Sequence, residues 1–353
     1  MRKMQEYVLK GKKIYVGLED SQKTWKVCVR SEGMTVDEAS MPAEYDILKR
    51  YFDNRFPECV IKVMYEAGFH GFWLHDLLED DGIDCIVTPP NKVTIEKDNR
   101  VKTDKRDARR LAKNLENKDY ASCKVPSRER REDRQISRTL GQMNKNIIST
   151  KNRIRRMCDY HHPVDGLKTG AWTNKDYFNL RNVEISESLK ICIEADLELL
   201  EFLLKNKEKL EKELLALCEK EGYKNGVNTK KSVPGIGKLT AIRLTLELGD
   251  MNRFETSKHF ASYLGLTSSE YSTGETIKRG RITGQGPSHV RSWFIESAWR
   301  AYRKDPALLE KFQNVCRNSG SKKKAIVAVA RKLACRLWTL ETTGQSYLLG
   351  VIE

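Results

Sequence analysis

The sequence lacks any segment suited to crossing a membrane. No apolar run approaches the roughly 18 to 20 residues that a membrane-spanning helix requires. The first residues, Met-Arg-Lys-Met-Gln-Glu, also lack the apolar core of a secretory signal. These absences predict a cytoplasmic protein without a membrane partner.

The cysteines lack the spacing of a zinc site or a disulfide framework. Nine cysteines are scattered along 353 residues, and no two of them form a Cys-x-x-Cys pair. An odd number without paired spacing is typical of reduced thiols in a reducing compartment. We therefore expect neither structural zinc nor disulfide bonds.

Acidic residues are too few to balance the basic ones. The chain has 64 Lys and Arg but 49 Asp and Glu, which gives a formal net charge of +15. Between residues 275 and 338 the imbalance is steepest, with 15 Lys and Arg against four Asp and Glu. Part of this charge, such as Lys322–Lys324, can be a solvated helix face. The excess as a whole indicates a polyanionic partner, and without a membrane that partner is a nucleic acid.

The first third of the chain has the pattern of an α/β domain. Residues 13–30 read as two strands joined by a polar turn. Residues 59–68 predict a buried strand that ends at Glu66, residues 72–79 a helix, and residues 83–90 a strand stopped by prolines. Strands that alternate with helices imply a sheet covered on both faces.

A basic helical segment at residues 102–113 carries two acids three residues apart. On a helix, Asp104 and Asp107 share a face with an apolar stripe. That stripe consists of Ala108, Leu111 and Leu115. Carboxylates facing this way favour a bound divalent cation. The alternative is a solvated helix whose acids pair with Lys105, Arg106 or Arg109.

Ligands of such a sheet gather at the carboxyl ends of its strands, where either Glu19 or Asp20 stands together with Glu66. Together with the two helical acids they make a four-carboxylate set. The motifs Val16–Glu19, Tyr65–Gly68 and Lys102–Ala108 resemble the ribonuclease-H-like nuclease core of the DEDD transposases of insertion elements, which is related to Holliday-junction resolvases. The resemblance extends to the RNA-guided bridge recombinases of this family.

The resemblance implies a Mg²⁺ site made by four acids. These are Glu19, Glu66, Asp104 and Asp107. The family's first strand ends in Gly-Ile-Asp, and registering the chain on Gly17 puts Glu19 in the aspartate's place. Asp20 is the alternative, although it lies on the opposite strand face and would need a bulge to substitute.

The middle of the chain, residues 126–225, is nearly all charged and aliphatic. Its leucines recur at helical spacing, as at Leu200, Leu203 and Leu210, and predict long amphipathic helices interrupted around residues 163–177. We interpret them as a coiled-coil spacer and dimerisation arm. An intramolecular bundle is the alternative, because the heptads are irregular.

A glycine turn follows at residues 232–243. Its Pro-Gly-Ile-Gly pattern before a helix resembles a helix-hairpin-helix clamp, in which main-chain N–H groups bind a backbone phosphate. A plain turn between packed helices explains the pattern about as well.

Residues 260–291 combine a hydroxyl-rich loop with a basic, glycine-punctuated turn. They resemble the serine domain that accompanies the DEDD core, in which the serine of a Ser-Thr-Gly context is the nucleophile. The resemblance puts that role on Ser272 rather than on Thr273, Ser268 or Ser269. Positive charge around a scissile phosphate is expected from four residues: Lys278, Arg279, Arg281 and Arg291. Together with His289 they are the predicted nucleic-acid-binding residues.

The sequence therefore predicts three domains. A ribonuclease-H-like α/β core spans residues 11–120, a helical spacer residues 126–225, and a mainly α-helical serine transposase domain residues 230–345. The resemblance implies DNA transposition or site-specific recombination for an insertion element, with DNA and a structured guide RNA as partners. It further implies a homodimer or homotetramer in the cytoplasm of a bacterium or archaeon, associated with the nucleoid.

Two other functions remain open at this point. One is a metal-dependent, resolvase-like nuclease in which Ser272 is structural. The other is a non-catalytic nucleic-acid-binding protein, which the Asp-to-Glu change at position 19 makes more credible.

Overall fold

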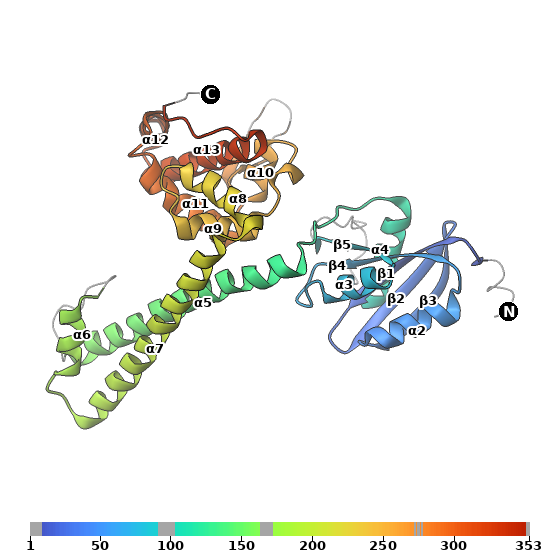
Figure 1. The fold of residues 1–353 in the computed structure, drawn as a ribbon, viewed down its shortest axis with the longest axis horizontal. Coiled ribbons are helices and arrows are strands. Elements are labelled where there is room, and N and C mark those ends of the chain that lie inside the picture. The colour runs from blue at the N-terminus through green and yellow to red at the C-terminus, as the bar shows by residue number, and fades with distance from the viewer. Residues whose placement is uncertain are drawn as a thin grey trace. The chain divides into compact units, whose positions relative to one another are not determined.

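The computed structural model describes residues 9–90, 103–162, 172–271, 273, 276 and 278–350. The chain forms two compact units, Met1–Pro126 and Ser127–Glu353, whose elements are labelled in Figure 1. Each unit has its own hydrophobic core. Among the described residues no helix is long and apolar enough to span a membrane.

The first unit is built on a five-stranded sheet in the order β3-β2-β1-β4-β5. The strands are β1 (Lys13–Asp20), β2 (Thr24–Ser31), β3 (Met34–Pro42), β4 (Val60–Glu66) and β5 (Asp84–Thr88). The pairs β1–β2 and β2–β3 are antiparallel, whereas β1–β4 and β4–β5 are parallel. The predicted hairpin and the two further strands are confirmed. The edge strand β3 was not predicted.

Helices cover both faces of this sheet (Figure 1). On one face, the helices α2 (Tyr45–Arg55) and α3 (Trp73–Asp80) share a core with the buried residues Val16 and Leu18 of β1. On the other face, α4 (Asp104–Asn117) buries Leu111 and Leu115 against Met64 of β4. This layered α/β arrangement is consistent with the ribonuclease-H-like core that the motifs imply.

Gly17 determines how closely α4 approaches the sheet. A Cβ atom at this position would lie 2.1 Å from the carbonyl oxygen of Ala108 and 2.3 Å from the amide nitrogen of Ala112. No side chain fits there, so the α4 backbone lies directly on β1. The same contact holds Asp107 of α4 near the carboxyl ends of the strands.

The second unit begins with two long helices, α5 (Arg128–His161) and α7 (Glu187–Leu217), with the short α6 (Asn174–Arg181) between them. The predicted long helices are confirmed. Their buried apolar residues pack against each other within the chain: Ile147, Ile154, Ile193, Leu197, Leu200 and Leu203. For these residues the structure agrees with the intramolecular alternative.

The remainder of the second unit is mainly helical. It contains α8 (Glu221–Ser232), α9 (Lys238–Leu248), η2 (Met251–Arg253), α10 (Ser257–Tyr263), α11 (Ser288–Ala301), α12 (Pro306–Ser319) and α13 (Lys322–Thr343). A small antiparallel hairpin, β6 (Ser268–Glu270) and β7 (Arg279–Ile282), interrupts the helices. The core gathers on α13, whose Val329, Leu333 and Leu337 are buried, while its first residues, Lys322–Lys324, are exposed.

A buried ion pair ties α12 to α13. An Nη of Arg336 lies 2.7 Å from a carboxylate oxygen of Asp305, and both side chains are nearly inaccessible. The other oxygen of Asp305 accepts the amides of Ala307 and Leu308, which caps α12. Burial alone would raise the pKa of Asp305, but a hydrogen bond from Tyr347 and the charge of Arg336 outweigh it and lower this pKa.

Replacing Gly17 by Ala should destabilise the first unit by about 3 kcal/mol, because the added methyl group meets backbone atoms that have no room to move. Gly68→Ala is the matched control, since its Cβ would find its nearest atom at 3.9 Å. Thermal unfolding measures both. Equal stability of the two variants would contradict the close packing of α4 on β1.

Asp305→Asn should lower the free energy of unfolding at pH 7 by about 3–5 kcal/mol, because it leaves the charge of Arg336 buried without its partner. The folded state holds the pKa of Asp305 low, so the stabilisation is complete above the unfolded value of about 3.9 and is lost as the pH falls through the folded value. Thermal unfolding at pH 7 and pH 3 tests this. Glu208→Gln, in an exposed pair, serves as the control. A difference that does not shrink at pH 3 would count against the assignment.

Candidate active site

Two of the predicted acids lie at the ends of neighbouring parallel strands. Successive side chains alternate between the faces of a strand. Glu19 therefore lies on the same face as Gly17, and Glu66 lies on the same face as Met64. That face is the one α4 covers. Because Leu18 pairs with Tyr65 in the β1–β4 register, the two acids stand side by side at the carboxyl edge.

The helix α4 contributes Asp107 to this place. Asp107 is buried, with 8% of its surface accessible. One guanidinium nitrogen of Arg110 lies 2.9 Å from Asp107 Oδ1 and 3.0 Å from Glu66 Oε1. Carboxylates from a strand and a helix thus share the positive charge of Arg110.

The pairing of these acids with Arg110 differs from the pairing predicted for a solvated helix, which involved other basic residues of the same segment. Lys105 and Arg109 do not serve the acids of their own helix but bind Glu38 on β3. The hydrogen bond from Arg109 lowers the pKa of Glu38 to about 2. Arg110, which was not among the expected partners, takes the place between Glu66 and Asp107.

Asp104 occupies a different environment from Asp107. It is the first residue of α4 and is exposed, although it precedes Asp107 by a single turn. Thr103 caps the helix by accepting the amide of Arg106. Within the part of the chain that the structure describes, no hydrogen bond or ion pair joins Asp104 to the other acids. Asp104 is therefore exposed at the start of α4 while Asp107 is buried, and the predicted role of Asp104 stays a prediction.

The end of β1 presents Glu19 and Asp20 to opposite faces. Glu19 accepts a hydrogen bond of 2.7 Å from the Ser21 hydroxyl. Asp20 points to the side of Leu18, and one of its oxygens is buried without a hydrogen-bond partner among the described residues. Burial, together with the charges of Glu19 and Glu66, raises the pKa of Asp20 to about 7. Of the two, Glu19 shares a face with Glu66 and Asp107.

The carboxylates are not arranged as a finished metal site. Over the residues that the structure describes, no three His, Cys, Asp or Glu side chains are grouped to hold a metal ion. A guanidinium joins Glu66 to Asp107 instead, and its Nε is buried without a hydrogen-bond partner. The donors are hard oxygens that already attract a cation, which is the chemistry that Mg²⁺ requires.

The hydroxyl-rich loop of the second unit is carried by the β6–β7 hairpin. Beyond the strands, Thr273 and Thr276 exchange backbone hydrogen bonds of 3.2 and 3.1 Å. The Ser269 hydroxyl donates to the carbonyl of Arg281. Ser272, the predicted nucleophile, lies outside the described residues.

The five predicted nucleic-acid-binding residues differ in how strongly the fold engages them. Lys278 and Arg281 are exposed, and the side chain of Arg279 lies outside the described part. Arg291 donates to the carbonyls of Leu264 and Gln285, so its guanidinium joins two loops.

His289 is also engaged within the fold. Its Nε2 lies 3.4 Å from Glu247, and its ring packs edge-on against Trp293. Burial would raise the pKa of Glu247, but hydrogen bonds from His289 and Arg138 lower it to about 2. His289 therefore has a structural partner in addition to any nucleic acid.

Both halves of the chain match models of known protein families. Residues 16–163 match the model of the DEDD transposases of IS110 elements, and residues 229–313 match the model described as "Transposase IS116/IS110/IS902 family". The first match includes Glu19, Glu66, Asp104 and Asp107, and the second includes Ser272.

Three relatives illustrate the similarity. The protein y4rJ of Sinorhizobium fredii, named as a transposase, is 28% identical over 94% of this chain and 92% of its own length. A second S. fredii protein named in the same way, y4qE, is 29% identical over 69% of this chain, which spans 59% of that relative's length. The transposase for insertion sequence element IS1533 of Leptospira borgpetersenii is 24% identical over 70% of this chain and 73% of its own length.

The two family matches, one to each half of the chain, therefore agree, and the chain belongs to the transposases of the IS110/IS116 family of insertion elements.

Proposed function

We propose that this transposase cleaves and rejoins the DNA of an insertion element through Ser272, assisted by Mg²⁺ held by Glu19, Glu66, Asp104 and Asp107. The observation that carries the proposal is the Arg110 guanidinium between Glu66 and Asp107. It identifies a place on the α4 face of the sheet where carboxylates from two elements bind one cation.

The acids fit Mg²⁺ by their donor chemistry. Glu66 and Asp107 contribute oxygens that already share a positive charge, and Glu19 lies on the same face one strand away. Asp104 stands one helical turn before Asp107 and would complete the set. Mg²⁺ bound there supplies Lewis-acid polarisation of a phosphoryl oxygen. Arg110 must then release at least one carboxylate, since a guanidinium and an ion compete for the same oxygens.

The serine step is a phosphoryl transfer. The Ser272 Oγ forms a bond to phosphorus, and the bond from phosphorus to one deoxyribose oxygen breaks. The serine proton passes to a base, and the leaving oxygen takes up a proton to become a hydroxyl. A protein–DNA phosphodiester results, and attack by a deoxyribose hydroxyl of another strand reverses the step and joins that strand. Lys278 and Arg281, both exposed, would offset the charge of the phosphate.

The partners follow from charge and from resemblance. DNA suits the basic stretch between residues 275 and 338. A structured guide RNA is proposed because the motifs resemble RNA-guided recombinases. The net charge of the chain is compatible with both polyanions.

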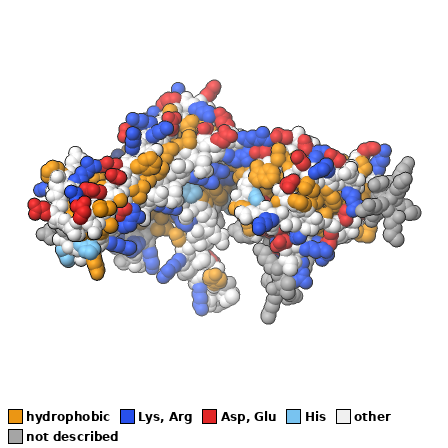
Figure 2. Space-filling view, turned by 90° about the horizontal axis from the view of Figure 1, so that it is seen from below, with side chains coloured by type: hydrophobic (Ala, Val, Ile, Leu, Met, Phe, Trp, Pro, Cys, Tyr) orange, Lys and Arg blue, Asp and Glu red, His pale blue; other side chains and the backbone are white. Residues whose placement is uncertain are grey.

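A homodimer or homotetramer is proposed as the active form. Large apolar side chains remain exposed on the long helices, including Ile148 on α5 and Ile191, Leu199 and Phe202 on α7. Apolar side chains are also visible among the charged ones on the face shown in Figure 2. Contiguous exposed apolar surface on a helix is typical of an interface.

One observation favours a second candidate, a nucleic-acid-binding protein with weak or no catalysis. A glutamate stands at position 19, where the family has aspartate, and Arg110 lies between two of the acids. Both features weaken a Mg²⁺ site, because ligand geometry for this ion is strict. Binding of DNA or RNA without strand transfer in the presence of magnesium would support this candidate.

Ser272→Ala should abolish the covalent protein–DNA adduct, because no other group is proposed to attack phosphorus. The measurement incubates protein, guide RNA and labelled element-end DNA with magnesium, then separates denatured products on a gel. Ser269→Ala is the matched control and should retain the adduct, since its hydroxyl is bound to a backbone carbonyl. Strand cleavage that persists in Ser272→Ala and disappears in Asp104→Ala would instead indicate a metal-dependent nuclease.

Arg110→Met should tighten the binding of divalent metal to the carboxylates, on the order of tenfold, because it removes a competing cation between Glu66 and Asp107. Asp107→Asn should weaken that binding by at least as much, since it removes a ligand. Calorimetric titration with Mg²⁺ or Mn²⁺ measures both without relying on activity. Arg110→Lys is the control that keeps the charge. Metal affinity that is the same in all of these variants would place the ion elsewhere.

A further inference from the structure

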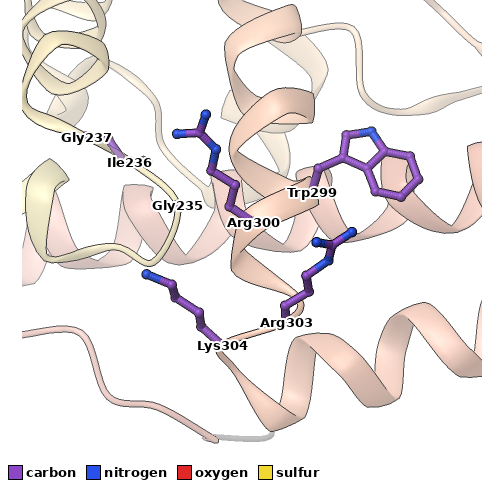
Figure 3. Close-up of a pocket in the computed structure, with 7 residues that line it drawn as sticks. All are labelled: Gly235, Ile236, Gly237, Trp299, Arg300, Arg303 and Lys304. Atoms are coloured by element: carbon purple, nitrogen blue, oxygen red, sulfur yellow. The ribbon is translucent and has the colours of Figure 1, made fainter.

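The turn between α8 and α9 forms one wall of a cavity whose other wall is basic. The cavity measures about 380 Å³ and is lined by seven residues: Gly235, Ile236, Gly237, Trp299, Arg300, Arg303 and Lys304. No acidic side chain is among these described lining residues. Figure 3 shows Arg300 and Lys304 extending toward the turn.

Gly235 seats this turn directly on α11. Its φ of +85° belongs to the left-handed region. A Cβ there would lie 2.3 Å from the carbonyl oxygen of Ser297 and 3.1 Å from the amide nitrogen of Ala301. The turn is thereby fixed against the last turn of α11, next to Arg300.

Gly237 lies between the cavity and the N-terminus of α9 and has no side chain to separate them. It is the N-cap of α9, and among the described residues no side chain caps the amides that follow it. A Cβ at Gly237 would meet no atom within 4 Å. The first turn of α9 contains no acid, so the positive end of the helix faces space without a negative charge of its own.

The cationic side chains of the cavity are not neutralised by acids. Across the described residues, neither Arg300 nor Lys304 has a side-chain hydrogen bond or an ion pair, and both are exposed. Arg303 interacts with the Tyr302 hydroxyl and ring, which are uncharged. The C-terminal end of a helix favours positive charge, which explains Arg300 at the end of α11. It does not explain the uncapped amides at the start of α9, across the cavity.

We propose that this cavity is a binding site for a backbone phosphate of duplex DNA. Arg300, Arg303 and Lys304 would neutralise the phosphate, and the free amides at the start of α9 would donate to its oxygens. Trp299 also lines the cavity, but its ring packs edge-on against Tyr302 and Phe312. The inference extends the proposed function, because DNA is the substrate of that function. It adds a DNA contact made by residues that are separated in sequence from Ser272.

Gly237→Asp tests the site against a structural role. An aspartate is a favourable N-cap, so thermal stability should stay the same or rise. Its charge and bulk occupy the phosphate position, so affinity for a 30-base-pair duplex of arbitrary sequence should fall about tenfold. A variant that is folded and binds the duplex as the wild type does would overturn the proposal.

The double variant Arg300→Gln with Lys304→Gln tests the opposite wall. Duplex affinity should fall about tenfold, and the slope of log affinity against log salt should decrease by about 0.9 for each phosphate that the variant no longer neutralises. Lys205→Gln with Lys209→Gln removes the same charge from exposed positions on α7. An equal loss in this control would show that net charge, not the cavity, determines binding.

These titrations are carried out without magnesium, so they are independent of cleavage. Loss of duplex affinity in Gly237→Asp supports the phosphate site even if Ser272 proves not to be a nucleophile. A tenfold weakening for single-stranded RNA with no change for duplex DNA would overturn the assignment of the ligand.

Discussion

The contact between the α4 backbone and Gly17 of β1 is the constraint on which the first unit depends. A strand and a helix approach without an intervening side chain, since even a methyl group at Gly17 would meet backbone atoms at 2.1 Å. This approach brings Asp107 of α4 to the strand end that carries Glu66. The carboxylates would repel one another without a cation, and Arg110 supplies one. In the proposed function, Arg110 and a metal ion are alternative partners of these carboxylates.

The second unit keeps positive charge available in a different way. Its buried charges are paired within the fold. Asp305 and Arg336 are both buried, and the buried Lys230 pairs with the partly exposed Glu341. Arg300 and Lys304, which line the cavity beside the glycine turn, have no such partners in the described part of the chain. Buried charges are thus paired, whereas Arg300 and Lys304 are exposed and unpaired among the described residues. These two side chains can therefore bind an anion from outside the chain. DNA is the polyanion on which transposases act.

Much of the first unit could be predicted from the sequence, because its strands are short apolar runs bounded by polar or turn residues. Two of these runs end in acids, which marked the candidate site. The strands ending at Asp20, Glu66 and Thr88 have strong β patterns and are confirmed. β3 escaped prediction because it is an edge strand whose residues stay partly exposed, so no apolar alternation marks it. Arg110 could have been found from its i,i+3 spacing to Asp107. Its choice over Arg109 could not, because that depends on Glu38, which lies on the unpredicted strand. The role of Ser272 still depends on resemblance alone.

The proposed metal site is tested most directly by diffraction from crystals of the full chain soaked in MnCl₂, with anomalous scattering used to locate the ion. We expect a manganese peak within bonding distance of Glu66 and Asp107, on the α4 face of the sheet, with the Arg110 guanidinium displaced from at least one of them. A fully occupied ion elsewhere, with Arg110 still bridging both carboxylates, would contradict it.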